Sequence, residues 1–295
     1  MEYNFNKNLI YNDKIGTMEN YRRCKICDGE VKLVNEKNNL GKCDSCELIF
    51  CLTKFSQDEF VKVYDGLYNK EDSAYQRHSA QEYNKILNNY KIKVGLNRSR
   101  LIKKTILNKH CKSVLEIGSG IGLIGVYIRS KNDKISYTGI EIDVETYKKS
   151  QHLNLNTING DFKEIENIGQ SFDVIMLWEV IEHLQDLKLF MELAYNKLNA
   201  NGKIILSTPN YERIYNYPKR DKDQLFQDTP PIHLNYFTKE NIKNVFQFFH
   251  FNNCKVKVKK FPYLEITKSR FYYNSIKALF NRYYGPTIYV EATKE

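Results

Sequence analysis

The 295-residue sequence lacks any apolar run near the roughly 20 residues that a helix needs to cross a bilayer. Residues Met1 to Tyr21 are polar and rich in asparagine, which excludes the apolar core of a secretory signal. Internal repeats and low-complexity tracts are also missing. Seven cysteines without an export signal indicate a reducing compartment and not a disulfide framework. We therefore expect a cytoplasmic protein without membrane insertion.

Hydrophobic residues make up 42% of the sequence, an ordinary share that provides a sizeable core. The formal net charge of +10 would suit acidic partners such as phosphates, nucleic acid or anionic lipid. The lysines are nevertheless scattered. The densest basic run, Lys255-Val-Lys-Val-Lys-Lys260, alternates with a period of two, which is typical of the solvent face of an edge strand. The charge alone therefore does not identify a nucleic-acid surface.

Four of the cysteines form two Cys-x-x-Cys pairs, Cys24 with Cys27 and Cys43 with Cys46. Four thiolates from paired knuckles can surround zinc tetrahedrally, and such a closed shell leaves no open position for chemistry. A redox dithiol is the alternative, but those motifs usually occur singly beside a βαβ unit. We predict a structural zinc ion. The remaining cysteines lie off this spacing, and we expect them to be buried thiols: Cys51, Cys111 and Cys254.

The run Ser113-Val-Leu-Glu-Ile-Gly-Ser-Gly-Ile-Gly122 predicts a short buried strand followed by a glycine turn and a helix. Glycines at alternate positions let the backbone turn sharply and approach a ligand. The start of the following helix offers free N–H groups to an anion. The pattern also satisfies the dinucleotide fingerprint, since Gly125 supplies a third spaced glycine and Glu141 an acidic residue downstream. By itself this run leaves two kinds of cofactor open.

The residues around the turn favour S-adenosylmethionine. Glu116 precedes the first glycine, where it could face the methionine ammonium through water. Glu141 ends the next predicted strand and could bind the ribose hydroxyls, and Asp161 could accept from the adenine amino group. Together with Phe172–Leu184, this ordered series resembles the class I S-adenosylmethionine-dependent methyltransferases over roughly residues 95–295. The resemblance implies that the cofactor contacts Glu116, Gly118, Ser119, Gly120, Gly122, Glu141, Ile142, Asp161, Phe162, Leu177 and Trp178.

Predicted strands alternate with predicted helices, which indicates an α/β fold: a doubly wound, mostly parallel sheet, with a small N-terminal zinc ribbon. The resembled fold implies that the last two strands form an antiparallel pair at the sheet edge. The strands are expected at 113–117, 135–141, 155–159, 172–178, 203–208, 254–261 and 287–294. The helices are expected at 97–109, 121–131, 144–151, 186–199, 238–249 (with Thr238 as N-cap) and 268–284.

We expect three parts along the chain: a zinc-ribbon module with its lead-in at 1–55, a connector at 56–96, and the cofactor domain at 97–295. The connector is rich in tyrosine (Tyr64, Tyr68, Tyr75, Tyr83 and Tyr90, with Arg77 and His78). Helical spacing predicts a helix from Ser79 to Leu96. This helix either packs over the main domain or forms a lid on the acceptor pocket. Ribbon and cofactor domain are expected to have separate cores.

A second group of chemically active residues follows the 172–178 strand. Glu179, Glu182 and His183 would share one face of a helix, and His233 could return to the same place. This run resembles the metal-dependent methyltransferases of small-RNA 3′ ends and the ubiquinone-pathway O-methyltransferases. A divalent cation on these residues would acidify the acceptor hydroxyl. Alternatively, His233 acts as a general base without metal, or the residues only shape the loop.

The sequence lacks an Asp/Asn-Pro-Pro-Tyr motif after the 172–178 strand, which argues against amino-directed methylation of nucleic-acid bases. The combined motifs resemble bacterial methyltransferases of sugars, nucleotide-linked sugars and other small metabolites. Sugar C-methyltransferases with a zinc module usually carry a further C-terminal domain, whereas this sequence ends at Glu295. We therefore expect O-methylation of a sugar-like acceptor, with or without phosphate. The alternatives are ribose methylation of RNA and a non-catalytic binding module.

Overall fold

The computed structural model describes residues 20–56, 59, 74–88, 92, 94–212, 229–262 and 266–295, and the account below concerns these residues. The side chains at 74–78 and 270 lie outside this described part. Within this part of the chain, no helix has the length and apolar character needed to cross a membrane. Predictions for Tyr64, Tyr68 and Tyr90, and for the side chains of Tyr75, Arg77 and His78, lie outside it.

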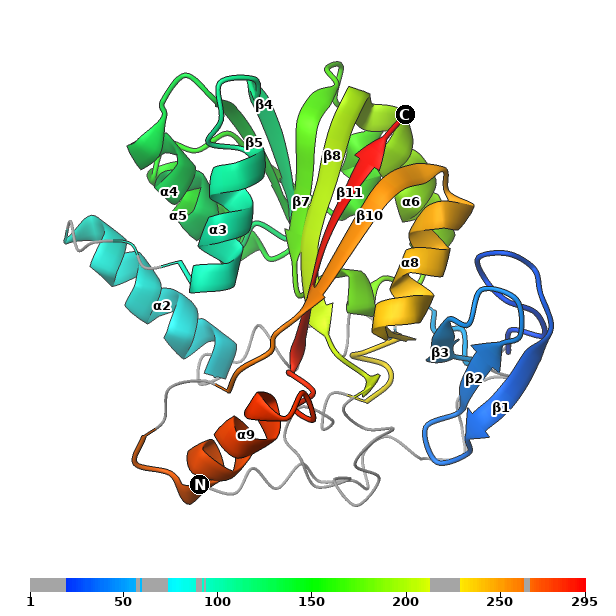
Figure 1. The fold of residues 1–295 in the computed structure, drawn as a ribbon. Coiled ribbons are helices and arrows are strands. Elements are labelled where there is room, and N and C mark those ends of the chain that lie inside the picture. Colours follow the sequence, from blue (N-terminus) through cyan, green and yellow to red (C-terminus); the bar gives the residue numbers. More distant parts are fainter. Residues whose placement is uncertain are drawn as a thin grey trace.

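A seven-stranded sheet forms the centre of the molecule, in the order β10-β11-β8-β7-β4-β5-β6 (Figure 1). The five strands from β8 to β6 run parallel, and β11 is antiparallel to both β8 and β10. This arrangement confirms the predicted fold class and the antiparallel edge pair. The strands are β4 Ser113–Ile117, β5 Ser136–Glu141, β6 Thr157–Asn159, β7 Phe172–Trp178, β8 Leu198–Pro209, β10 Phe251–Val258 and β11 Thr287–Lys294.

Helices cover both faces of the sheet. On one face lie α3 (Leu96–Thr105), α4 (Leu123–Lys131) and α5 (Val144–His152), and on the other lie α6 (Leu187–Lys197) and α8 (Lys239–Phe248) (Figure 1). Strand β7 is apolar on both sides because it is buried between these layers. Its residues alternate between the two cores: Val174, Met176 and Trp178 pack with α3 and α4, while Ile175 and Leu177 pack with α6 and α8.

Helix α8 begins as the sequence predicts. The Thr238 hydroxyl accepts from the backbone N–H of Asn241 at 3.1 Å, and the Asn241 side chain accepts from the Thr238 N–H at 2.8 Å. This is a capping box in which asparagine takes the place of the usual glutamate. The remaining amide group of Asn241 donates to the carbonyl oxygen of Glu47 at 3.3 Å, so the start of α8 is tied to the N-terminal module.

The N-terminal module consists of β1 (Val31–Asn35), β2 (Leu40–Cys43) and β3 (Ile49–Cys51), which pair antiparallel. A fourth strand, β9 (Asn235–Tyr236), pairs with β3 and completes this sheet, although it lies between β8 and α8 in the sequence. The expectation of separate cores is wrong. The buried residues Cys24, Ile26, Cys43, Cys46, Leu48 and Phe50 belong to the same core as Leu177, Ile181 and Phe190 of the central domain. The predicted domain boundaries themselves stay a prediction.

The connector helix differs from its prediction. Helix α2 covers Ala74–Leu87 and α3 starts only at Leu96, so the continuous helix expected from Ser79 to Leu96 is wrong. Tyr83 and Ile86 of α2 pack against the core beneath α3 and α4. Between β10 and β11, the predicted inserted helix is present as α9 (Ser269–Leu279). Strand β10 starts at Phe251, three residues before its predicted start, and is the edge strand expected from its lysine alternation.

Candidate functional site

The turn after β4 depends on glycine. Gly118, Gly120 and Gly122 have φ angles of 68°, 55° and 80°, in the left-handed region that other residues rarely adopt. The N–H groups of Gly118 and Ser119 donate to the carbonyl oxygen of Ile140 at 2.9 and 3.0 Å, which fastens the turn to β5. A Cβ on Gly118 would lie 2.6 Å from Val180 Cγ2. The loop therefore brings bare backbone to the carboxyl edge of the sheet.

Glu116 is buried beneath this turn, with 2% of its surface exposed. Its Oε2 accepts from the Tyr137 hydroxyl at 2.5 Å. Burial raises the pKa of Glu116 from its usual 4.5 to about 8, and the Tyr137 hydrogen bond and the Arg98 charge only partly oppose that shift. A carboxyl group held neutral in this way would ionise when a cation arrives. Glu116 is therefore suited to receive an ammonium group.

Glu141 ends β5 and is oriented by backbone N–H groups on both oxygens. Its Oε2 accepts from Gly120 at 2.6 Å, and its Oε1 accepts from Asp143 at 2.9 Å. Burial raises the pKa of Glu141, against the effect of these two hydrogen bonds. The carboxylate thus lies directly beside the glycine turn, where the topology of an open α/β sheet places a ligand.

Arg98 is a candidate site residue that the sequence reasoning missed. Its guanidinium carbon lies 4.8 Å from the centre of the Trp178 ring. Its positive charge lowers the pKa of both Glu116 and Glu179, although burial raises both overall. The available signal was its position four residues before the buried Ile102 on α3, because this puts a cation on the buried stripe of the helix.

Trp178, the only tryptophan in the sequence, is 8% exposed at the end of β7. Among the described residues, its indole N–H finds no hydrogen-bond partner. A buried donor without a partner is costly, and a bound ligand can satisfy it. The glycine turn, two buried carboxyl groups, a guanidinium group and this indole N–H therefore lie near one another at the carboxyl ends of β4, β5 and β7. Their chemistry fits S-adenosylmethionine, which carries an ammonium, a carboxylate, a sulfonium and a nucleoside.

The remaining predicted cofactor residues are of two kinds. Asp161 caps the short 3₁₀ helix η3 (Phe162–Ile165), and its Oδ1 accepts from the Lys163 N–H at 2.8 Å. Ile142 is 52% exposed. Phe162 packs edge-on against Phe190 at 5.6 Å, and Leu177 is fully buried. The side chains of Phe162 and Leu177 thus belong to the core on the α6 face.

The second predicted group does not lie on one α-helix face, so that expectation is wrong. Ile181–His183 form a 3₁₀ turn, η4. Glu179 precedes it with a left-handed φ of 57°, while its N–H continues the sheet pairing to Ser207 O at 2.9 Å. Three residues nevertheless meet: potential ligand atoms of Glu182, His183 and His233 lie within 4.8 Å of one another. Glu179 is not a member of this cluster, which we call the acid–imidazole cluster.

The two imidazoles of the acid–imidazole cluster pack edge to face, with their centres 4.8 Å apart. His183 Nδ1 lies 2.8 Å from the carbonyl oxygen of Ile232. A carbonyl can only accept, so Nδ1 carries the proton and Nε2 is left as the acceptor or ligand atom. The Thr208 hydroxyl donates to Glu182 Oε2 at 3.0 Å. Burial, and to a smaller extent the charge that His183 would carry if it were protonated, lower the pKa of His233 to about 3. Both rings are therefore neutral at neutral pH.

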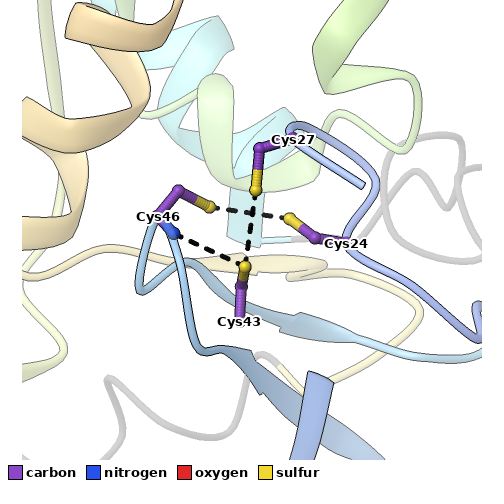
Figure 2. A group of neighbouring side chains, drawn as sticks. All are labelled: Cys24, Cys27, Cys43 and Cys46. Carbon is purple, nitrogen blue, oxygen red and sulfur yellow. Dashed lines mark hydrogen bonds between the residues drawn. The ribbon is translucent and has the colours of Figure 1, made fainter. Parts of the chain in front are cut away.

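The four predicted zinc ligands converge. Cys24, Cys27, Cys43 and Cys46 point toward one another in Figure 2, and their sulfur atoms lie within 4.8 Å. The Sγ atoms of Cys24 and Cys46 are 3.5 Å apart, as are those of Cys27 and Cys43. A tetrahedral shell with Zn–S bonds of about 2.3 Å separates its sulfurs by about 3.8 Å. Backbone N–H groups of Ser45 and Cys46 also donate to Cys43 Sγ, as expected for thiolate ligands. The donor set fits zinc.

Comparison with known families decides the assignment. A family model described as a methyltransferase domain matches residues 81–256. The chain belongs to this methyltransferase family. It is 30% identical over 101 residues to a ubiquinone biosynthesis O-methyltransferase of Azorhizobium caulinodans, covering 33% of the chain and 40% of the relative. The corresponding enzyme of Rickettsia typhi is 29% identical over 101 residues, covering 33% of the chain and 41% of the relative. The chain thus spans about two fifths of the curated relatives that it matches.

Solved structures agree on the fold of this methyltransferase. A methyltransferase from Archaeoglobus fulgidus dependent on S-adenosylmethionine is 17% identical, with a TM-score of 0.52, covering 80% of this chain and 99% of that one. A Haloferax volcanii methyltransferase complex with the activator Trm112 is 13% identical, with a TM-score of 0.52. This match covers 74% of this chain and 95% of that one. The chain therefore carries a methyltransferase domain with the class I fold, and this match argues against the dinucleotide alternative.

Proposed function

We propose that the enzyme transfers the methyl group of S-adenosylmethionine to a hydroxyl of a small acceptor, such as a sugar, a nucleotide-linked sugar or a related metabolite. The observation that carries this proposal is the acid–imidazole cluster at the carboxyl edge of β7 and β8, beside the predicted cofactor site. A hydroxyl is a weak nucleophile until its proton is withdrawn. The cluster supplies groups that can withdraw it. The partial match to O-methyltransferases of ubiquinone biosynthesis supports a hydroxyl acceptor.

For the cofactor, we propose that Glu116 receives the methionine ammonium and Arg98 the methionine carboxylate. Glu141 lies beside Gly120 and would hold the ribose hydroxyls. Asp161 would accept from the adenine amino group through the oxygen that does not cap η3. The turn that contains Gly118, Ser119, Gly120 and Gly122 would pass close to the methionine part, because its three glycines have no side chains. Trp178 would cover the cofactor from the α3 side.

Two routes to an activated hydroxyl fit the acid–imidazole cluster. In the metal route, Glu182, His183 and His233 would hold a divalent cation that acidifies the acceptor hydroxyl. In the base route, His233 itself accepts the proton. A pKa of about 3 makes a weak base, whereas a neutral imidazole is the form that binds metal. The low pKa of His233 and the convergence of three ligand atoms therefore favour the metal route, with Glu179 outside the cluster.

A chelator separates the routes. If the metal route operates, EDTA should abolish methyl transfer, and Mg²⁺ or Mn²⁺ should restore it. If the base route operates, EDTA should have little effect, while His233→Ala should lower turnover by about 10²–10⁴-fold. His110→Ala is the control, because His110 is exposed and far along the chain from the cluster. Full activity of both the His233→Ala enzyme and the EDTA-treated enzyme would rule out a role for the cluster.

We further propose that Cys24, Cys27, Cys43 and Cys46 hold one structural zinc ion. All-thiolate sites of this kind contribute to folding and take no part in the chemical step. Elemental analysis of freshly purified protein should find about one zinc per chain. Substitution of Cys46 by serine should remove it, whereas substitution of the buried Cys111 should not. Protein without zinc, purified without chelators, would contradict the assignment.

The acceptor itself is best found by a parallel screen. Purified enzyme with labelled S-adenosylmethionine should be offered nucleotide sugars, glycan fragments, phenols and small RNA. We expect label in an alkali-stable ether of a small molecule. Label in RNA would instead support ribose methylation, the alternative suggested by the Glu-x-x-Glu-His run and the net charge of +10.

A further inference from the structure

The four-cysteine module extends into the acid–imidazole cluster through β9. Strand β3 begins shortly after Cys46, and it pairs with β9 through Ile49↔Tyr236 and Phe50↔Asn235. The Cys51 N–H donates to the carbonyl oxygen of Leu234 at 2.9 Å, next to His233. The strand that leaves the second cysteine knuckle is therefore bonded directly to the segment carrying His233.

Asn235 joins this strand to the other half of the cluster. Its side chain is 2% exposed, and its Nδ2 donates to the carbonyl oxygens of Ile181 at 2.9 Å and Leu184 at 2.8 Å. These two carbonyls bracket Glu182 and His183. The Leu234 N–H also donates to Glu182 O at 2.8 Å. A single buried side chain thus fixes the η4 turn against β9, while the Asn235 backbone belongs to the ribbon sheet.

A second contact reaches the same turn from the first cysteine knuckle. Lys25 lies between Cys24 and Cys27, and its Nζ donates to the carbonyl oxygens of Leu184 at 3.4 Å and Gln185 at 3.2 Å. Leu184 O therefore receives both Lys25 and Asn235. The first knuckle thus contacts the segment that follows His183 directly, the second reaches it through β3 and β9, and the ribbon cysteines share one core with Ile181.

We infer that the four-cysteine module is a working part of the active site: when its cysteines hold metal, β3 and Lys25 keep β9 and η4 in place, and Asn235 is the positioning residue that sets His233 against Glu182 and His183. The inference rests on the proposed roles of the cluster and of the zinc site. Opening of the knuckles would loosen β3. Residues 229–238 would then lose local order before the glycine turn, which lies on the other side of β7.

Hydrogen–deuterium exchange followed by mass spectrometry tests the coupling without any acceptor. Removal of zinc, either by a chelator strong enough to take it from the four thiolates or by Cys46→Ser, should speed amide exchange in a peptide covering 229–238 by about tenfold or more. Exchange in 113–122 should stay within about twofold, and so should the affinity for S-adenosylmethionine read from Trp178 fluorescence. Lys32→Ala is the matched control, because Lys32 is an exposed ribbon residue that forms a surface ion pair with Asp44.

The positioning role is tested with Asn235→Asp, which keeps the shape of the side chain but cannot donate to the two carbonyls. Once an acceptor is known, this variant should lower kcat by about tenfold or more with the KM for S-adenosylmethionine unchanged. Unchanged exchange at 229–238 after zinc removal would overturn the coupling while leaving the zinc assignment intact. Protein without zinc would overturn both, and an unchanged kcat of the Asn235→Asp enzyme would overturn the positioning role.

Discussion

The guanidinium carbon of Arg98, in the first turn of α3, lies 4.8 Å from the centre of the Trp178 ring at the end of β7. The same charge acts on the Glu116 and Glu179 carboxyl groups. Arg98 thus lies against an aromatic ring, and two buried carboxyl groups are within range of its charge. The role proposed for Arg98 is to bind the carboxylate of S-adenosylmethionine.

Arg98→Ala should weaken binding of S-adenosylmethionine by about 10–100-fold, because a hydrogen-bonded charge contributes about 1.5–3 kcal/mol. Quenching of Trp178 fluorescence gives the affinity directly, since the protein has one tryptophan. Arg100→Ala, on the exposed side of the same helix, should bind like the parent. Equal affinity in the Arg98 variant would restrict that residue to packing on Trp178.

Binding of S-adenosylmethionine should release a proton from Glu116. The carboxyl group has a pKa of about 8 while it is buried without a cation, and a bound ammonium would lower that pKa. At pH 7 the group would therefore change from neutral to charged on binding, and affinity should rise from pH 6 to pH 8. Binding calorimetry in two buffers of different ionisation enthalpy measures this release, because the difference in binding enthalpy between the buffers gives the number of protons released. Glu116→Gln should show no such release, and an identical count in both proteins would contradict the prediction.

Glu116 should also shape the pH dependence of stability without cofactor. Its pKa is raised from 4.5 to about 8 on folding, so between these values the folded state holds the proton more tightly. The stabilising contribution is therefore present below pH 4.5 and is lost as pH rises through 8, by up to about 1.4 kcal/mol per pH unit. Urea unfolding of the parent and of Glu116→Gln at pH 5, 6, 7 and 8 should diverge accordingly. If the free energies of unfolding of the two proteins instead changed with pH in parallel, the assigned pKa would be refuted.

Gly120→Val should abolish cofactor binding. Gly120 has a left-handed φ of 55°, which a β-branched residue adopts at high cost, and its N–H donates to Glu141, the proposed ribose-binding residue. Gly169→Val is a suitable control, because a Cβ there would meet nothing within 4 Å. Fluorescence titration of both variants, after their folding has been checked by circular dichroism, makes the comparison. Normal binding by the Gly120 variant would show that the turn does not approach the ligand.

The periodic parts of the fold could be predicted from the sequence. Strands Ser113–Ile117 and Phe172–Trp178 have the predicted bounds because each is a short buried run ended by a glycine or an acid. Strand Thr287–Lys294 also starts and ends as predicted. The cap at Thr238 was visible because capping is local.

The contacts that make the site could not be predicted in the same way. The β3–β9 pairing joins residues almost two hundred positions apart, and β9 is too short to give a periodic signal. The turn at 181–183 fails as an α-helix because Glu179 takes a left-handed conformation while its N–H stays bonded to β8. The clustered cysteines were evident from spacing, but spacing does not tell which core they join.

An equilibrium titration of the purified protein with S-adenosylmethionine and, separately, with NADH tests the central claim most directly. We predict saturable quenching of Trp178 fluorescence by S-adenosylmethionine at one molecule per chain, with the response lost in Gly120→Val and weakened in Arg98→Ala, and no saturable response to NADH. Tight binding of NADH together with no binding of S-adenosylmethionine would contradict the account.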